Sequence, residues 1–104
     1  MARVMPSNNE AEMSILGICF LDKYLLERIC ESLTVDMFYD ERNKNLFEVI
    51  NEMHNNNIPI DANTLKDELD KKKKLNIVGG MEYISEVIDS VISSANMDYN
   101  MEII

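Results

Sequence analysis

The sequence predicts an all-α fold, a compact bundle of about six helices, and three observations lead to this prediction. Apolar residues recur every three to four positions along most of the 104-residue chain, which is the helical period. Three glycines and two prolines are too few for an all-β sandwich, which needs a turn about every 8–12 residues. Hydrophobic residues make up 46% of the chain, enough for a packed core. We therefore expect residues 1–104 to form a single domain.

The first predicted helix begins with a capping-box-like pair, either Ser7 with Glu10 or Asn9 with Glu12. Apolar residues cover much of its circumference, so this helix is expected at the centre of the bundle. Gly17 lies near its middle, where glycine costs roughly 1 kcal/mol relative to alanine. Close approach of a neighbouring helix is the expected reason for that glycine.

Asp22 is the expected N-cap of a second, amphipathic helix. Its apolar residues follow the i, i+3, i+4 rule: Leu25, Leu26, Ile29, Cys30 and Leu33. Residues 34–39 form a short connector, from which Phe38 and Tyr39 are expected to enter the core. Asp40 then opens a third helix.

The third helix ends in an asparagine turn at 55–57, and residues 58–60 must be extended because they contain a proline. Asp61 caps a fourth helix, which ends in the lysines at 71–74. Cations there complement the helix dipole, so we interpret these lysines as a solvated helix end. A phosphate-binding patch is the alternative interpretation.

Gly79 and Gly80 separate the fourth helix from a fifth, and Ser93 or Ser94 is expected to cap a sixth. The sixth helix is still in phase at Ile104, so we expect the chain to be cut from a longer polypeptide. The helical period brings ten residues into one predicted core: Ile15, Leu16, Leu26, Ile29, Phe47, Ile50, Leu65, Leu69, Ile84 and Ile88.

The sequence supplies the parts of no enzyme site, so we predict no catalytic, cofactor-binding or metal-ligating residue. The glycine pair at 79–80 lacks the Lys-Ser/Thr continuation of a phosphate-binding loop. His54 is the only histidine, whereas a di-iron bundle needs two Glu-x-x-His motifs. We interpret His54 as a partly buried, hydrogen-bonded side chain. Neighbouring carboxylates, such as Glu10 with Glu12 and Glu68 with Asp70, are expected on solvated helix faces.

Charge and cysteine content limit the partners and the compartment. The formal net charge of −9 would repel a nucleic-acid backbone, so we expect no direct contact with nucleic acid. Cys19 and Cys30 fit no metal spacing and are expected as buried, reduced thiols. No apolar run approaches the ~18 residues of a membrane span, and no signal-peptide core is present. We therefore expect a soluble, cytoplasmic domain without a membrane partner.

Short segments spread along the chain carry a resemblance to a known family. They are residues 6–12, 15–17, 38–39, 60–61 with 64–65, 79–84, and 95–96 with Tyr99 and Ile103. In order and spacing, these segments resemble the N-terminal domain of bacterial and phage replicative DNA helicases of the DnaB family.

The resemblance implies a function. In that family the domain is an all-helical head, followed by a helical hairpin, a linker and a RecA-like motor that uses ATP and Mg²⁺. The heads pair into dimers, form the N-terminal collar of a hexameric ring, and dock primase; the helicase loader is a further candidate partner. The resemblance thus implies a non-catalytic interaction and assembly domain for DNA replication, truncated before the hairpin. The alternative is a freestanding phage-type regulator that mimics the collar and intercepts helicase, loader or primase.

Tyr83 is the single candidate site residue. It follows the glycine pair at 79–80, and on a helical projection it flanks the apolar stripe of the fifth helix. A tyrosine in that position would present a large, stiff surface with a polar tip, as interaction hot spots do. The family resemblance places the matching tyrosine on the primase-facing surface, so we expect partner binding here. The alternative is that Tyr83 packs at the edge of the core.

Overall fold

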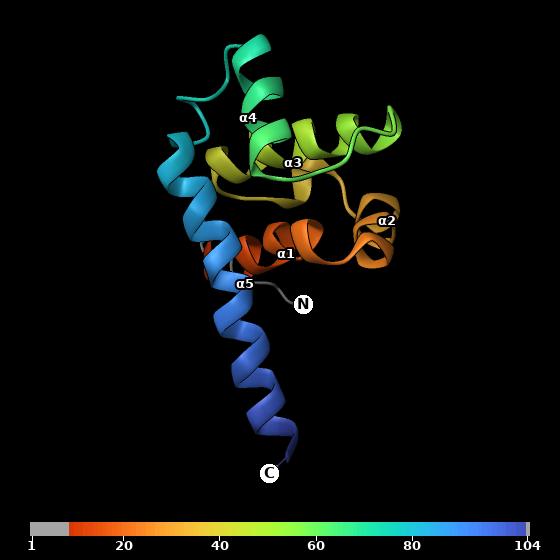
Figure 1. The fold of residues 1–104 in the computed structure, drawn as a ribbon, viewed down its shortest axis with the longest axis vertical. Coiled ribbons are helices and arrows are strands. Elements are labelled where there is room, and N and C mark those ends of the chain that lie inside the picture. The colour runs from red at the N-terminus through yellow and green to blue at the C-terminus, as the bar shows by residue number, and fades with distance from the viewer. Residues whose placement is uncertain (1–8, 104) are drawn as a thin grey trace.

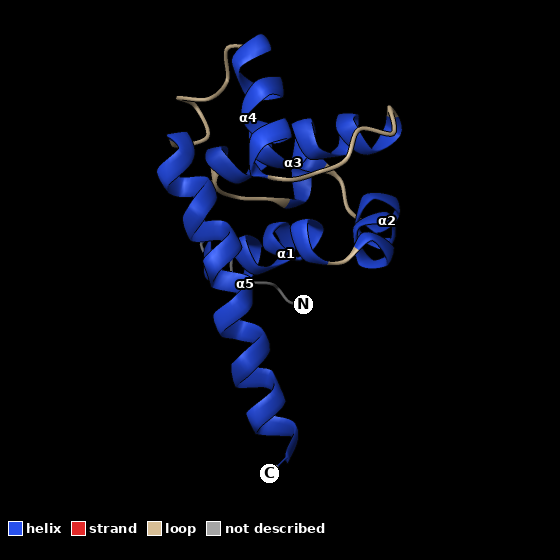
Figure 2. Cartoon of the chain, viewed as in Figure 1, coloured by secondary structure: helices blue, strands red, loops and turns tan. Residues whose placement is uncertain are grey.

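The computed structural model describes residues 9–103, with side chains described as far as Val91. Helices joined by loops make up this part of the chain, which contains no strand (Figures 1 and 2). Its elements are α1 (Asn9–Leu21), α2 (Lys23–Ser32), the short 3₁₀ helix η1 (Val35–Met37), α3 (Glu41–Asn55), α4 (Ala62–Lys71) and α5 (Gly80–Ile103). The predicted all-α class is confirmed, with five α-helices in the described residues in place of about six.

The predicted fifth and sixth helices are one helix. α5 runs without a break for 24 residues, and its C-terminal half projects beyond the other helices (Figure 1). Ser93 and Ser94 therefore lie inside α5, and neither begins a helix. No glycine or proline interrupts residues 81–104, and a serine alone does not end a helix whose period continues.

The core forms around α1, which packs on α5, α3 and α2, and α4 closes it by packing on both α3 and α5 (Figure 1). Gly17 lies at the crossing of α1 and α5, where a Cβ atom would be 2.5 Å from the carbonyl oxygen of Val87. A helix with any larger residue there would have to move away. The close approach predicted from Gly17 is confirmed.

All ten predicted core residues face the interior. Seven are buried: Leu16, Leu26, Phe47, Ile50, Leu65, Leu69 and Ile84. The other three, Ile15, Ile29 and Ile88, are partly buried and pack against this cluster.

The connector between α2 and α3 places one of its two aromatic rings in the core. Phe38 is buried, with its ring centroid 5.0 Å from that of Phe47. Tyr39 is 63% exposed, so the expectation that it also enters the core is wrong. The backbone is extended at Phe38, and successive side chains of an extended chain point in opposite directions.

Aspartates begin three of the helices, as predicted. Asp22, Asp40 and Asp61 each accept a backbone N–H hydrogen bond from the first turn of the helix that follows. Asp61 forms a full capping box, because the hydroxyl of Thr64 accepts a hydrogen bond from the Asp61 backbone N–H in return. Residues 58–60 lie in the loop between α3 and α4, outside any helix (Figure 1).

Two helices end in residues with a left-handed backbone. Asn57 (φ 61°) follows α3, and Lys73 (φ 60°) follows α4. At each end two backbone N–H groups bond back to carbonyls of the last turn, in the Schellman pattern. Glycine or asparagine usually occupies this position, so Lys73 is the unusual one.

None of the helices in the described residues combines the length and the hydropathy that crossing a bilayer requires.

Candidate interaction site

Tyr83 lies in the first turn of α5, and it is buried. Its exposed fraction is 4%, so the expectation that it flanks the buried stripe and presents a surface is wrong. The buried face of α5 contains Tyr83, Ile84, Val87 and Val91. This face is rotated about the helix axis toward Tyr83, compared with the apolar stripe that the sequence predicted. The packing of α5 on α1 and α3 decides this rotation, and the sequence period alone did not reveal it.

The buried amide of Asn43 is the hydrogen-bonding partner of Tyr83. Asn43 is fully buried on α3, and its Oδ1 accepts a hydrogen bond of 2.5 Å from the Tyr83 hydroxyl. Its Nδ2 donates to Oδ1 of Asn9 and to Oε1 of Glu12, both at 2.7 Å. One side chain on α3 thereby joins α1 to α5, and both of its polar atoms are satisfied, as burial demands.

Glu12 joins α1 to the start of α3. Its Oε2 accepts a hydrogen bond of 2.6 Å from the backbone N–H of Tyr39, and its Oε1 lies 3.3 Å from the backbone nitrogen of Asp40. The expectation that Glu12 lies on a solvated face is therefore wrong. Asn9 is the first residue of α1, and its side chain also turns toward α3, so Asn9 and Glu12 form no capping box. The other proposed cap, Ser7, lies outside the described residues.

The guanidinium of Arg42 covers the ring of Tyr83. It lies 4.1 Å from the ring centroid, within the range of a cation–π interaction. Asp40 holds it there through hydrogen bonds to Nε at 3.0 Å and Nη2 at 2.9 Å. These bonds lower the pKa of the Asp40 carboxyl, while burial raises the pKa of the Tyr83 phenol. The Arg42 side chain is 41% exposed, so the surface above Tyr83 presents a cation.

Three of the four lysines at 71–74 pair with carboxylates. Lys74 pairs with Glu48 at 2.5 Å and Lys72 with Glu52 at 2.9 Å, while Lys71 lies 3.5 Å from Glu68. These pairs support the interpretation of a solvated helix end over a phosphate-binding patch, because the charge is already neutralised by neighbours.

Cys19 and His54 have the burial that the sequence predicted, whereas Cys30 is less buried than expected. Cys19 is buried and Cys30 half-buried, and both are free thiols. Burial raises the pKa of Cys19 to about 12 and also raises that of Cys30, so neither thiol is readily ionised. His54 is half-buried, but its ring has no hydrogen-bonding partner in the described part of the chain, contrary to expectation. Among residues 9–91, whose side chains the structure describes, no three His, Cys, Asp or Glu side chains are grouped as metal ligands.

Sequence reasoning missed four residues of this site: Asn9, Glu12, Arg42 and Asn43. A signal existed for one of them. Asn43 lies three and four residues before Leu46 and Phe47, in phase with the apolar stripe of α3. An amide on such a stripe indicates a buried polar group that needs partners.

Comparison with known proteins shows to which family this chain belongs. The family model described as the DnaB-like helicase N terminal domain matches residues 4–104. The chain belongs to this DnaB-like helicase N-terminal domain family. It is 32% identical over 102 residues to the replicative DNA helicase DnaB of Geobacillus stearothermophilus, and 33% identical over 102 residues to that of Rhodothermus marinus. Each alignment covers 98% of this chain.

The same family is found among solved structures. The crystal structure of the N-terminal domain of DnaB helicase from Mycobacterium tuberculosis superposes with a TM-score of 0.79 at 32% identity, covering 90% of this chain and 68% of that one. The chain spans 22% of the G. stearothermophilus DnaB and 11% of the R. marinus DnaB. The match is to the N-terminal domain of DnaB-like helicases, so the prediction that these residues are not an enzyme in themselves is confirmed.

Proposed function

We propose that this domain is the interaction and assembly module of a replicative helicase, forming the N-terminal collar of its ring and docking primase. The observation that carries the proposal is the match to the DnaB-like N-terminal domain along residues 4–104. In this proposal the hairpin, linker and ATP-hydrolysing motor belong to the rest of the helicase. The helicase loader is a second candidate partner.

Two further observations support this proposal. The relatives named above are replicative helicases, which favours a helicase domain over the freestanding regulator. The net charge of −9 and the carboxylate-paired lysines suit a domain that contacts proteins and not the phosphates of DNA.

The buried position of Tyr83 changes how it would contribute to docking. With 4% of its surface exposed, the ring has little area to offer a partner. Arg42 lies over that ring and reaches solvent, and Asp40 fixes the direction of its guanidinium. We therefore expect Arg42 to contact primase and Tyr83 to position it. Arginine is among the residues enriched at interaction hot spots.

Isothermal titration calorimetry of the domain with primase from the same organism measures their affinity and tests this proposal. Arg42→Ala should weaken binding by about tenfold or more, which corresponds to roughly 1.4 kcal/mol. The matched control is Arg28→Ala, because Arg28 also lies over a tyrosine ring, that of Tyr24, at 5.9 Å. That variant should bind primase as the unaltered domain does.

Two outcomes would count against the proposal. Primase that does not bind the unaltered domain would contradict docking by this module. Equal losses from Arg42→Ala and Arg28→Ala would show that the surface above Tyr83 is not the docking site.

A further inference from the structure

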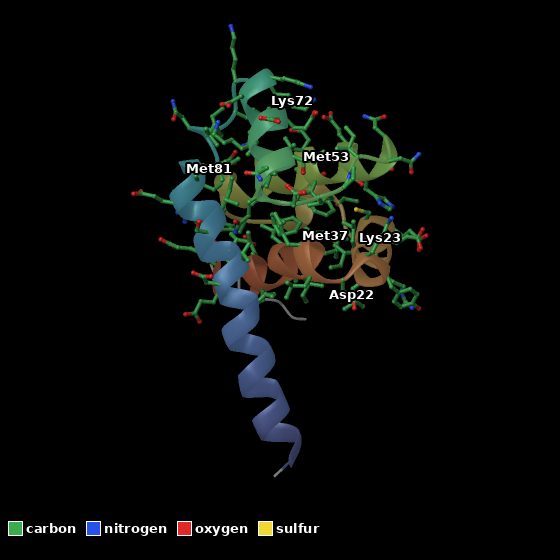
Figure 3. The ribbon with its side chains drawn as sticks, in the orientation of Figure 1. Asp22, Lys23, Met37, Met53, Lys72 and Met81 are labelled. Atoms are coloured by element: carbon green, nitrogen blue, oxygen red, sulfur yellow. The ribbon has the colours of Figure 1, made fainter. Side chains whose placement is uncertain are left out.

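A pocket of about 450 Å³ lies at the opposite end of α1 from Tyr83. The corner between α1 and α2 forms one wall, and the loop between α3 and α4 forms the other. Figure 3 labels Asp22 and Lys23 at that corner. Asn9 and Glu12 lie at one end of α1 and the pocket residues Cys19 and Phe20 near the other, so the two sites are separated by roughly 15 Å of helix.

The lining combines apolar surface with charged side chains that reach solvent. Buried Leu26 and half-buried Phe20 and Ile58 supply apolar surface. Lys23 and Glu27 also line the pocket, and in the described residues neither side chain has a hydrogen bond or an ion pair. They are four residues apart on α2, with the lysine first, which is the less favourable order for pairing with each other. A pocket that offers both apolar surface and charged groups without a protein partner can bind a ligand that carries both kinds of group.

The loop between α3 and α4 also offers backbone groups. No other described residue bonds to the carbonyl of Ile58 or to the N–H and carbonyl of Ile60. Thr64 holds the loop in place through its hydroxyl, which donates to the carbonyl of Pro59 at 2.7 Å. A loop that is held in place and has free backbone groups can bond to the backbone of an extended peptide.

We infer that this pocket docks an extended peptide of a partner protein, with an apolar side chain inserted beside Leu26 and a lysine or arginine next to it. Charge supports a basic peptide. The domain carries a net charge of −9. In the described residues Glu27 at the pocket has no ion pair, whereas Glu48 pairs with Lys74 and Glu52 with Lys72. Lys23 is then free to donate to a carbonyl of the peptide. This inference does not rest on primase docking or on assembly of the ring.

The test uses a synthetic hexapeptide, Lys-Val-Leu-Phe-Lys-Gly, blocked at both ends, and ¹H–¹⁵N spectra of the domain. Chemical-shift changes should cluster at the backbone amides of Lys23, Leu26, Glu27 and Ile60. A peptide with glutamate in place of both lysines should bind at least fivefold more weakly. A peptide with serine in place of its three apolar residues should not bind.

Two charge reversals on α2 provide the matched comparison. Glu27→Lys should reverse the preference, so that the acidic peptide binds better than the basic one. Glu31→Lys is the control, because Glu31 is exposed one turn further along α2 and does not line the pocket. Absence of shift changes at the pocket at millimolar peptide, or equal effects of the two reversals, would overturn the inference.

Discussion

The hydroxyl oxygen of Tyr83 lies 2.5 Å from Oδ1 of Asn43, and this hydrogen bond joins the first turn of α5 to the first turn of α3. The same asparagine binds Asn9 and Glu12 through its other polar atom. Residues far apart in the chain thus meet around one buried amide. The helices are tied together at this end by polar contacts as well as by apolar packing.

Removing the hydroxyl alone tests this hydrogen bond. Tyr83→Phe should lower the free energy of unfolding by roughly 1–2 kcal/mol, because Oδ1 of Asn43 would stay buried without its donor. Tyr83→Ala should cost about 3–5 kcal/mol, as expected for truncating a large core side chain. Urea unfolding followed by circular dichroism measures both. Tyr24→Phe is the control, since Tyr24 is 63% exposed, and an unchanged stability for Tyr83→Phe would contradict the structure.

Gly17 should not tolerate a methyl group. In Gly17→Ala the new Cβ would lie 2.5 Å from the Val87 carbonyl oxygen and 2.9 Å from the Val91 Cβ. Separating α1 from α5 should cost roughly 1–3 kcal/mol, more than the ~1 kcal/mol that alanine gains in helix propensity. The midpoint of thermal unfolding should therefore fall. A rise in that midpoint would show that the helices do not approach as closely as described.

Glycine at position 73 should stabilise the domain. Lys73 has a φ of 60°, a conformation that costs an L-residue roughly 1–2 kcal/mol and costs glycine almost nothing. After subtracting the greater freedom of glycine in the unfolded chain, Lys73→Gly should raise the free energy of unfolding by up to about 1 kcal/mol. Urea unfolding checks this value. Lys66→Gly, within α4, should have the opposite sign, and a loss of stability in both variants would refute the explanation.

Asp40 should make stability depend on pH in the acid range. Its folded-state pKa is below the ordinary value of 3.8, mainly because Arg42 donates hydrogen bonds to its carboxylate. The stabilisation is therefore present above about pH 4 and is lost as the pH falls through the folded pKa. Asp40→Asn should be less stable than the unaltered domain at pH 7, and the difference in the free energy of unfolding should narrow as the pH falls below about 4. A difference that stays constant over this range would contradict the assignment.

Much of the local structure followed from the sequence. Asp22, Asp40 and Asp61 cap the helices they were expected to cap, because a carboxylate can satisfy free N–H groups a few residues away without help from the rest of the fold. The helical period placed all ten expected residues at the core. The family, too, was recognisable from short segments in register.

The tertiary structure alone decided the polar contacts and the position of Tyr83. The hydrogen bonds of Asn43 connect residues 31, 34 and 40 positions away, and no local pattern specifies such partners. The rotation of α5 that buries Tyr83 depends on how it packs against two other helices, and the pocket beside Glu27 exists only because the α1–α2 corner meets residues 58–60. Helix caps and turns are short-range effects that the sequence determines by itself, whereas the burial of one side chain is settled only when distant helices come together.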